Sequence, residues 1–389
     1  MQKKITLFLF LTFIFQLGFS QYKQLSPKAE ISIITAGPGK VLYEGFGHST
    51  IRIKDLDFDD AYNYGIFDFE APNFYINFTK GKLLYKLQKY PFHYFVRSYN
   101  KDKRWIKEQV LNLNQEEKQR FYEYVENNAK PENASYYYDP FFNNCATKLR
   151  EITDIVLSDK VKFKTDHLKD ERSYRELMNQ EIPWNTWGSF GINLALGSKL
   201  DAKATAKGFM YLPDYVFSGF NNAINNSTSE KLIKKERNLL KFDELKVSIS
   251  IINPLVVFTL IMLFGFWITY KDVIRKRRSK WFDFTIFFLT GIIGILLSFL
   301  WFFTDHSTTP NNYNILWAFA PNIFIAFLLL KQQTQNWLRK YLQFIVLLLL
   351  ITPIIWISKI QQLPLACIPF LLLLLVRYLY LIKKLLPSH

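Results

Sequence analysis

The sequence predicts an α+β domain on the outer face of a membrane, followed by an all-α transmembrane bundle of about five helices. Three observations lead to this prediction. Residues 21–245 are polar and charged like a soluble domain, whereas residues 246–389 are almost continuously apolar. The chain begins with an export signal, and Lys and Arg gather in alternate loops of the apolar half. Such a change in composition marks two solvents, water and then lipid.

Residues 1–20 have the pattern of a signal peptide. A basic start, residues 1–4, precedes an apolar core at 5–19, and the small residues Gly18 and Ser20 permit cleavage after Ser20. An uncleaved anchor is the alternative, which the short apolar run disfavours. Either form sends the following domain across the membrane.

The apolar half contains five segments of about the length that a helix needs to cross the hydrocarbon core. They are residues 251–270, 281–303, 313–330, 341–358 and 363–382. Loops 271–280 and 331–340 are rich in Lys and Arg, whereas loop 304–312 contains neither. The positive-inside rule places the basic loops and the C-terminus in the cytoplasm. The soluble domain then lies on the periplasmic face of the cytoplasmic (inner) membrane.

Within the soluble domain, strand and helix patterns alternate. Alternating or β-branched residues predict strands at 31–35, 48–54, 61–67 and 105–111, with a hairpin loop at 55–60. Asn114, followed by acidic residues, predicts the start of a helix that ends near residue 128. A short aromatic piece at 136–138 precedes a second predicted helix from Pro140 to about Leu157.

The formal net charge is +16, from 49 Lys and Arg against 33 Asp and Glu. Much of this charge lies beside the apolar segments, where membrane topology accounts for it. The sequence has no zinc-finger, RNA-binding or helix-turn-helix pattern, so we expect a membrane-embedded protein without a nucleic-acid partner. His, Cys and Asp residues do not cluster with ligand spacing, so we expect no metal ion and no cofactor.

Cys145 is the only cysteine of the soluble domain, because the second, Cys367, lies in an apolar segment that we expect in lipid. No disulfide can therefore form within the domain. Cys145 stands in the opening turn of a predicted helix, where backbone N–H groups and the helix dipole stabilise a thiolate. His48 begins a predicted strand after two glycines, and a nearby imidazole would take the thiol proton.

Each of these two residues has a structural alternative. A lone cysteine at a helix start is often a small buried residue, and a histidine on a strand is often a satisfied core group. Together, the sole cysteine of the domain and a glycine-flanked histidine favour a catalytic pair. His93 and His167 have no comparable setting.

A third group should hold the imidazole of such a pair. If the strands at 48–54 and 61–67 pair around the 55–60 loop, His48 lies opposite Phe67 or Asp68. Asp68 is therefore the first candidate for the orienting residue, and Asn63 is the second.

Asp305 and His306 follow the second apolar segment at its outer boundary, where ionisable residues are costly and often functional. A solvated loop with a charged pair is an equal alternative. If functional, the two residues lie on the same side as Cys145 and would hold a lipid headgroup or an incoming amine. An aromatic group, Trp184, Trp187 and Phe190, either seats the domain at the membrane or belongs to its core.

The order of His before Cys resembles the circularly permuted branch of the papain-like superfamily, which includes lecithin:retinol acyltransferase-type enzymes and relatives of the NlpC/P60 hydrolases. A closer resemblance, over most of the chain, is to the Lnb family of bacterial membrane proteins. The segments that carry it are Thr35-Ala-Gly-Pro-Gly39, Gly47-His-Ser-Thr50, Tyr62-Asn-Tyr-Gly-Ile-Phe-Asp68, Asn73-Phe74, Asn144-Cys-Ala-Thr147, Leu196-Gly197, Asp201, Leu212-Pro213 and Asp305-His306. This resemblance implies a permuted papain-like (NlpC/P60-like) periplasmic domain and a role in lipoprotein N-acylation.

With the Cys–His pair, the resemblance implies a membrane thiol acyltransferase. Cys145 would take an acyl chain from a phospholipid donor as a thioester, with His48 as base, and pass it to the N-terminal amine of a diacylated lipoprotein acceptor. Backbone N–H groups near Cys145, with the Asn144 side chain, would stabilise the oxyanion. One alternative is a cysteine hydrolase acting on peptidoglycan peptides or lipid esters. Another is a non-enzymatic membrane assembly or transport component.

Overall fold

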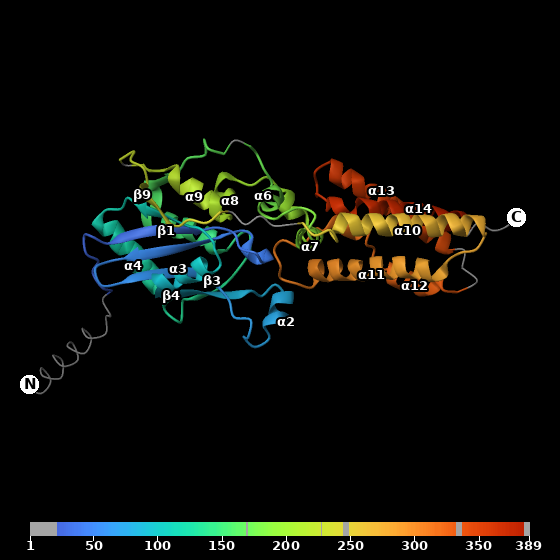
Figure 1. Cartoon of the computed structure of the whole chain (residues 1–389), viewed down its shortest axis with the longest axis horizontal. Helices are drawn as coiled ribbons and strands as arrows, with labels where there is room; N and C mark the ends of the chain where they lie inside the picture. Colours follow the sequence, from blue (N-terminus) through green and yellow to red (C-terminus); the bar gives the residue numbers. More distant parts are fainter. Residues whose placement is uncertain (1–21, 169, 227, 244–248, 332–336, 385–389) are drawn as a thin grey trace, which may run out of the picture.

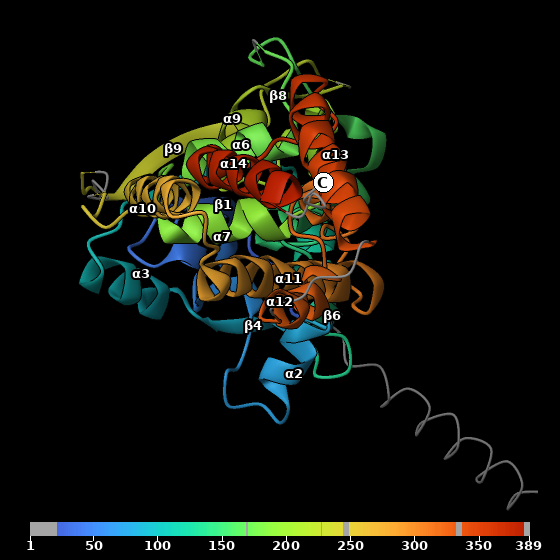
Figure 2. The same cartoon turned by 90° about the vertical axis from the view of Figure 1, so that its right-hand side faces the viewer.

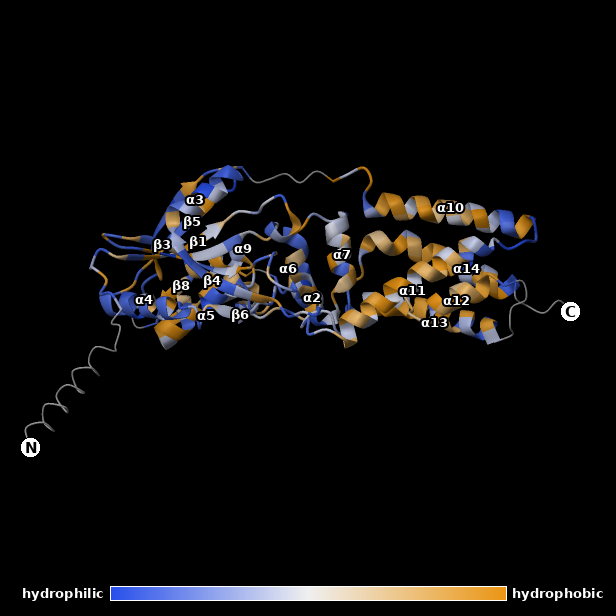
Figure 3. Ribbon diagram, turned by 90° about the horizontal axis from the view of Figure 1, so that it is seen from below, coloured by the Kyte–Doolittle hydropathy of each residue, from blue (hydrophilic) through white to orange (hydrophobic). Residues whose placement is uncertain are grey.

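The computed structural model describes residues 22–168, 170–226, 228–243, 249–331 and 337–384. The predicted signal peptide, residues 1–20, lies outside these described residues. A sheet-containing domain occupies one end of the molecule and a bundle of long helices the other (Figure 1). The bundle is predominantly apolar, whereas polar and apolar residues are mixed in the sheet domain (Figure 3).

A seven-stranded antiparallel sheet with the strand order β6-β4-β3-β2-β1-β5-β9 forms the centre of the first domain. Its strands are β1 (Glu30–Ala36), β2 (His48–Lys54), β3 (Asp59–Ile66), β4 (Leu84–Pro91), β5 (Ile106–Leu111), β6 (Ser135–Tyr137) and β9 (Ile233–Leu240). A separate ribbon joins β7 (Val161–Phe163) and β8 (Ala223–Asn225). The four strands expected from the sequence correspond to β1, β2, β3 and β5, with ends that differ by at most two residues.

Helices cover both faces of this sheet. α4 (Gln115–Ala129) and α5 (Cys145–Leu157) pack on one face, and α3 (Phe92–Lys101) packs on the other. α4 begins at the predicted cap, where Asn114 Oδ1 accepts the Glu117 N–H at 2.9 Å. The other helical segments of the domain are η1 (Leu42–Glu44), α2 (Phe74–Thr79), η2 (Ser158–Lys160), α6 (Tyr174–Glu181), α7 (Trp187–Ala195), η3 (Ser198–Asp201), α8 (Ala206–Phe209) and α9 (Pro213–Asn221).

The alternation of side chains along β1 explains why the sheet has a hydrophobic core on each of its two faces. Ile31 and Ile33 are buried on the face that α4 and α5 cover, whereas Ile34 is buried against Phe92 and Phe95 of α3. Successive strand residues point to opposite faces, so a strand covered on both sides is apolar at nearly every position. The central strands β1 and β2 therefore form a rigid base for side chains at their ends.

The second predicted helix begins at Cys145 rather than at Pro140. Asp139 Oδ1 accepts the N–H groups of Phe141 and Phe142 at 2.9 and 3.0 Å. A carboxylate that bonds to backbone two or three residues ahead forms a turn in place of the first helical turn. This turn delays the helix and leaves Cys145 as its first residue.

Four helical segments of the described bundle are long and apolar enough to cross a membrane. They are α10 (Pro254–Ile274), α11 (Lys280–Phe302), α13 (Trp337–Ile357) and Leu365–Lys384, which comprises η5 (Leu365–Cys367) and α14 (Ile368–Lys384). α10 lies beside α14, and α11 beside α12 (Asn322–Leu329) (Figure 2). The basic loop between α10 and α11 lies at the end of the bundle farthest from the sheet domain, as the predicted topology requires (Figure 1).

Residues 313–330 differ from the prediction, because they do not form one continuous helix. The segment contains the turn η4 (Tyr313–Leu316) and then the short helix α12, with Pro321 at the N-cap position of α12. The buried Asn322 side chain donates to Thr290 Oγ1 of α11 at 3.0 Å. Polar side chains packed against neighbouring helices permit such an irregular backbone at membrane depth.

A buried ion network joins three of the long helices. Arg377 of α14 donates to Asp283 of α11 at 2.6 Å and to Asp272 of α10 at 2.7 Å. Arg278 lies 3.5 Å from the second oxygen of Asp283. Charges in an apolar bundle need such partners, so this network fixes α10, α11 and α14 in one arrangement.

The sheet domain is attached to the bundle by backbone contacts around the segment 194–201. The Gly197 N–H donates to the carbonyl of Thr308 at 2.9 Å, and the Gln362 N–H donates to Asp201 Oδ1 at 3.0 Å. A Cβ on Gly197 would lie 1.8 Å from the Pro310 carbonyl oxygen, so only glycine permits this approach. The loops outside the long helices therefore hold the sheet domain directly on the bundle.

The aromatic residues of α7 lie at the same boundary. Trp187 Nε1 donates to the carbonyl of Ile252 at 2.9 Å, and the Phe190 ring lies 5.1 Å from that of Phe258 near the start of α10. Trp184 is half exposed. Thus α7 packs on the first turns of a candidate membrane span.

Candidate active site

Cys145 lies at the N-terminus of α5, where this helix meets β2 and β3. Asn144 caps the helix, because its Oδ1 accepts the N–H groups of Ala146 and Thr147, both at 2.9 Å. The backbone N–H groups of Ser49 and Ala146 also lower the pKa of the thiol. Cys145 is 9% exposed, so its thiol is nearly enclosed by protein.

His48 is the first residue of β2 and forms a hydrogen bond with Cys145. Gly47 precedes it with φ +71°, and a Cβ at Gly47 would lie 2.8 Å from the Ala36 carbonyl oxygen. A residue with a side chain would be strained in that conformation and would clash with β1. Gly47 thus supplies the turn that directs His48 toward α5.

Asn63 of β3 holds the other side of the imidazole. Its Oδ1 lies 2.6 Å from His48 Nε2, and its Nδ2 donates to the Tyr90 hydroxyl at 2.7 Å. Because an amide oxygen only accepts, the proton sits on Nε2 and the other ring nitrogen is left for the Cys145 sulfur. Phe95 lies beside the ring, with centroids 6.3 Å apart. The structure thus brings together Cys145, His48 and Asn63.

The surroundings favour an ion pair between thiolate and imidazolium. Burial raises the pKa of the Cys145 thiol, but the charge of His48 and its hydrogen bond outweigh burial, and the pKa is lowered. Burial lowers the pKa of His48, but Cys145 and the bond to Asn63 outweigh it, and the pKa is raised despite the opposing charge of Arg104. A thiolate is the nucleophilic form of cysteine, so these surroundings favour the reactive form of Cys145.

The predicted pairing of His48 with Phe67 or Asp68 is wrong in register. Ile51 of β2 pairs with Tyr62 of β3, which places His48 near Gly65. Asp68 lies in the exposed loop beyond β3, where its Oδ1 accepts the Glu70 N–H at 2.9 Å. The hairpin loop is shorter than the sequence indicates, because β3 begins at Asp59. The residue that contacts the imidazole is therefore the second candidate, Asn63.

Gly65 is a residue of the site that the sequence reasoning did not single out. The ladder between β3 and β4 shifts register between Asn63 and Ile66, and Gly65 has φ +91° within this irregularity. A Cβ there would lie 3.7 Å from the Cβ of Cys145 and 3.6 Å from the Tyr138 ring. The glycine inside a strand pattern was the available signal for a bulge.

Asn144, Asp305 and His306 are the remaining predicted site residues. The Asn144 Nδ2 group donates to the carbonyls of Pro140 and Tyr211 at 2.7 and 2.8 Å, so its side chain positions α5 and has no amide N–H directed at the sulfur. The Asp305 N–H donates to the Lys80 carbonyl at 2.8 Å, which places Asp305 and His306 at the membrane-facing edge of the sheet domain. No group of His, Cys, Asp and Glu in the described part of the chain has metal-site geometry.

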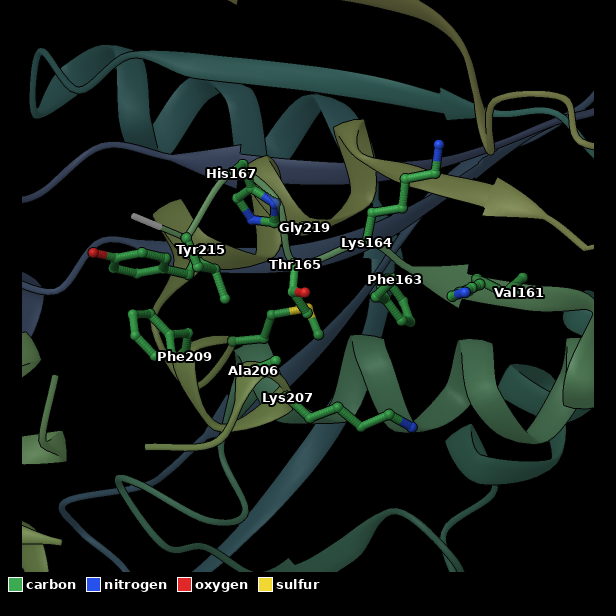
Figure 4. Close-up of a pocket in the computed structure, with 13 residues that line it drawn as sticks. Val161, Phe163, Lys164, Thr165, His167, Ala206, Lys207, Phe209, Tyr215 and Gly219 are labelled. Carbon is green, nitrogen blue, oxygen red and sulfur yellow. The ribbon is translucent and has the colours of Figure 1, made fainter. Parts of the chain in front are cut away.

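A cavity of about 200 Å³ lies elsewhere in the domain, between β7 and the α8–α9 region (Figure 4). Phe163, His167 and Phe209 are among the residues that line it, and Cys145 and His48 are not. It is separate from the Cys–His site.

The fold and the site define a membrane protein whose outer α/β domain carries a cysteine–histidine–asparagine group. Comparison with protein families gives two matches: the Lnb N-terminal periplasmic domain over residues 19–187 and the Lnb transmembrane domain over residues 246–386. Together they cover most of the sequence, and the chain belongs to the Lnb family. No curated protein and no solved structure matches it.

Proposed function

We propose that this protein is a membrane thiol acyltransferase that moves an acyl chain from a phospholipid to the N-terminal amine of a diacylated lipoprotein. The observation that carries the proposal is the Cys145–His48 pair, whose thiol pKa is lowered and whose imidazole pKa is raised, in a domain fixed to the outer end of a membrane bundle. Both proposed substrates are anchored in the leaflet that this domain faces.

In the first half-reaction, the Cys145 thiolate attacks an ester carbonyl carbon of the phospholipid. A carbon–sulfur bond forms and the ester carbon–oxygen bond breaks. The His48 imidazolium gives its proton to the departing glycerol oxygen, which releases a lysophospholipid. The acyl chain remains on Cys145 as a thioester, and His48 is left neutral.

In the second half-reaction, the neutral N-terminal amine of the lipoprotein attacks the thioester carbon. An α-amine has a pKa near 8, so a useful fraction is neutral at physiological pH. The carbon–nitrogen bond forms, the carbon–sulfur bond breaks, and His48 accepts the amine proton. The thiolate–imidazolium pair is thereby restored, and no further reactant is needed.

The oxyanion of both steps needs hydrogen-bond donors. N–H groups in the first turn of α5 point out of the helix start, and that of Cys145 would donate to the oxyanion. The Asn144 side chain supports this geometry as the helix cap rather than as a donor.

We further propose that the outer domain is a circularly permuted papain-like (NlpC/P60-like) fold. In support, the cysteine begins a helix that packs on an antiparallel sheet, while the histidine and asparagine come from adjacent strands earlier in the chain. The cysteine–histidine–asparagine combination is one of the known arrangements of papain-like proteases.

The test is turnover in phospholipid vesicles that contain the full-length protein and a diacylated lipopeptide with a free N-terminal amine. We expect each lipopeptide to gain one acyl chain while one lysophospholipid appears, and Cys145→Ala to form neither. Cys367→Ala, which removes the other cysteine, is the matched control and should keep the activity. Free fatty acid in place of acylated lipopeptide would indicate a hydrolase, and full activity of Cys145→Ala would contradict any thiol mechanism.

A further inference from the structure

Exposed apolar side chains lie on two segments near the Cys–His site. We define the apolar rim as Leu42 and Tyr43 of η1 together with Phe69, Tyr75, Ile76 and Phe78 at and around α2. Tyr75 is 70% exposed and Ile76 is 54% exposed, and α2 has no buried residue. Such a concentration of exposed apolar surface on one domain marks a contact with another apolar partner.

The α2 half of the rim is placed at membrane height by its neighbours. A Cβ on Gly81, just after α2, would lie 2.5 Å from the His306 backbone nitrogen. His306 follows the end of α11 at Phe302 by four residues, and Phe302 and Phe303 are 63% and 73% exposed. α2 therefore lies close to the outer end of a candidate membrane span.

The η1 half is placed in the same way. Leu42 reaches within 2.9 Å of the Cβ position of Gly188 in α7, and the adjacent Trp187 bonds to Ile252 just before α10. Phe67 joins the two halves, because its ring centroid lies 6.3 Å from that of Tyr43 and 4.7 Å from that of Phe69. The rim thus runs along the membrane-facing end of the sheet domain.

The position of α2 indicates what covers it. Seen along the bundle, α2 projects to one side of the helices (Figure 2), and it lies at the end of the sheet domain nearest the bundle (Figure 1). In a membrane, the outer leaflet would lie beside the bundle at that position. Lys80 and Lys82 follow α2, and basic groups beside an apolar surface match anionic phosphates above hydrocarbon.

A row of aromatic rings leads inward from α2. Phe74 of α2 lies 6.0 Å from Phe67, Phe67 lies 4.9 Å from Tyr85, and Tyr85 stacks on Tyr138 at 4.3 Å between centroids. The row ends beside Gly65, where an added Cβ would lie 3.6 Å from the Tyr138 ring and 3.7 Å from the Cys145 Cβ. Apolar side chains thus connect the exposed rim to the catalytic candidate.

We propose that the apolar rim inserts into the outer leaflet and that the aromatic row guides a phospholipid acyl chain from the leaflet to Cys145. The insertion stands on the exposure and position of the rim alone. The guidance rests on the proposed acyltransferase function, because it names the route of the donor to that same site.

Insertion is tested without catalysis. In full-length protein carrying Cys145→Ala and Cys367→Ala, Ile76→Cys is labelled with an environment-sensitive fluorophore and reconstituted into phospholipid vesicles with nitroxide-bearing acyl chains. Leu56→Cys is the matched control, because Leu56 is 74% exposed but lies in the β2–β3 hairpin, at the far end of β2 from His48. We expect a blue-shifted, quenched probe at position 76 and neither effect at 56. Equal behaviour at both positions overturns the insertion.

Guidance is tested with Ile76→Asp in the otherwise unchanged protein. We expect at least tenfold slower formation of the Cys145 thioester from vesicle phospholipid, and an unchanged rate with a water-soluble short-chain ester. If Ile76→Asp formed the thioester from phospholipid as fast as wild type, the route would be overturned. An equal loss of rate with phospholipid and with the short-chain ester would overturn it as well. Wild-type protein that forms no thioester would instead reject the proposed function, while the fluorescence result would still decide the insertion.

Discussion

At the scale of single residues, the reactivity of Cys145 depends on neighbours that oppose the effect of burial. A buried thiol without a partner has a raised pKa and is inert. Here His48 supplies a positive charge and a hydrogen bond, and Ser49 and Ala146 supply N–H groups to the sulfur. The contacts with Cys145 also raise the pKa of the His48 imidazole. The two residues therefore titrate as a pair rather than separately.

This pairing predicts how thiol reactivity depends on pH. The lowered pKa of Cys145 extends its thiolate form to lower pH, and the raised pKa of His48 extends its imidazolium form to higher pH, so both shifts favour the ion pair. The thiolate is lost as the pH falls through the lowered thiol pKa, so alkylation should persist to lower pH than for an ordinary thiol, whose pKa is about 8.5. In His48→Ala, burial dominates and alkylation at neutral pH should fall sharply. Rates of iodoacetamide labelling across pH, in a Cys367→Ala background, measure this. Identical profiles with and without His48 would be inconsistent with the pair.

A second prediction separates Asn63 from Asp68. Asn63→Ala removes the group that holds His48 Nε2, so thioester formation should slow on the order of 10²-fold, a typical effect of losing well-oriented acid–base catalysis. Asp68→Ala is the matched control, since Asp68 bonds only locally to Glu70, and it should change the rate less than about twofold. Single-turnover kinetics compare the two. A larger effect from Asp68 would reverse the assignment.

Part of the cysteine–histidine–asparagine group could be predicted from the sequence. Cys145 and His48 were identifiable because a helix start and a glycine-flanked strand start are local patterns. The choice between Asn63 and Asp68 depended on the register of β2 against β3, which is not a local property. Gly65 and Tyr138 belong to the site through a bulge and through contacts between distant segments, which periodicity does not reveal.

At the scale of elements, the Asn144 side chain both caps the start of α5 and links it to other segments of the chain. Asn144 bonds to the helix N–H groups with its oxygen and to two carbonyls with its nitrogen. It thus joins the helix cap to Tyr211, just before α9. A single side chain that makes these bonds fixes both the position and the direction of the helix start.

Asn144→Ala should therefore lower the free energy of unfolding by more than the loss of an ordinary helix cap does. Loss of an N-cap costs about 1–2 kcal/mol, and the two carbonyls left without their donor add to this. Thr205→Ala, at the exposed cap of the short helix α8, is the control with an ordinary cap and should cost less. Thermal unfolding in detergent measures both. Equal stability of the two variants would show that the Asn144 bonds to distant carbonyls contribute little.

The membrane elements show what hydropathy does and does not reveal. It located α10, α11, α13 and α14, because length and apolar composition alone define a span. It missed the interruption between η4 and α12, because a few buried asparagines and one proline scarcely change the average hydropathy. Their hydrogen bonds to neighbouring segments satisfy the backbone there, and this depends on the tertiary structure.

At the scale of the whole molecule, the sheet domain is not a domain on a flexible tether. Segment 194–201 bonds to the loops outside α11 and before α14, and α7 packs on α10. Backbone donors and acceptors make much of this interface, so its geometry is fixed by close approach. The sequence predicted the membrane spans and the side of the membrane on which the sheet domain lies. The contact between the domain and the bundle arises from segments far apart in the chain.

Gly197 and Gly191 form a matched pair for this interface. Gly197→Ala would put a methyl group into the Pro310 carbonyl, where backbone cannot yield, and should destabilise the protein by roughly 1–3 kcal/mol, as overpacking does. Gly191 lies in α7, and an added Cβ would meet only open space there. Gly191→Ala should therefore be neutral or stabilise the protein by about 0.5–1 kcal/mol, the difference in helix propensity between glycine and alanine. Thermal unfolding in detergent ranks the two variants. The opposite order would show that the observed interface does not hold in the membrane protein.

The most direct measurement of the central claim is the mass of the Cys145 peptide after incubation of full-length protein with phospholipid and no acceptor. The account predicts an acyl adduct on Cys145 that hydroxylamine removes, that is absent in Cys145→Ala, and that disappears when diacylated lipopeptide is added and acylated lipopeptide forms. An unmodified Cys145 peptide, together with lipopeptide acylation that continues in Cys145→Ala, would contradict it.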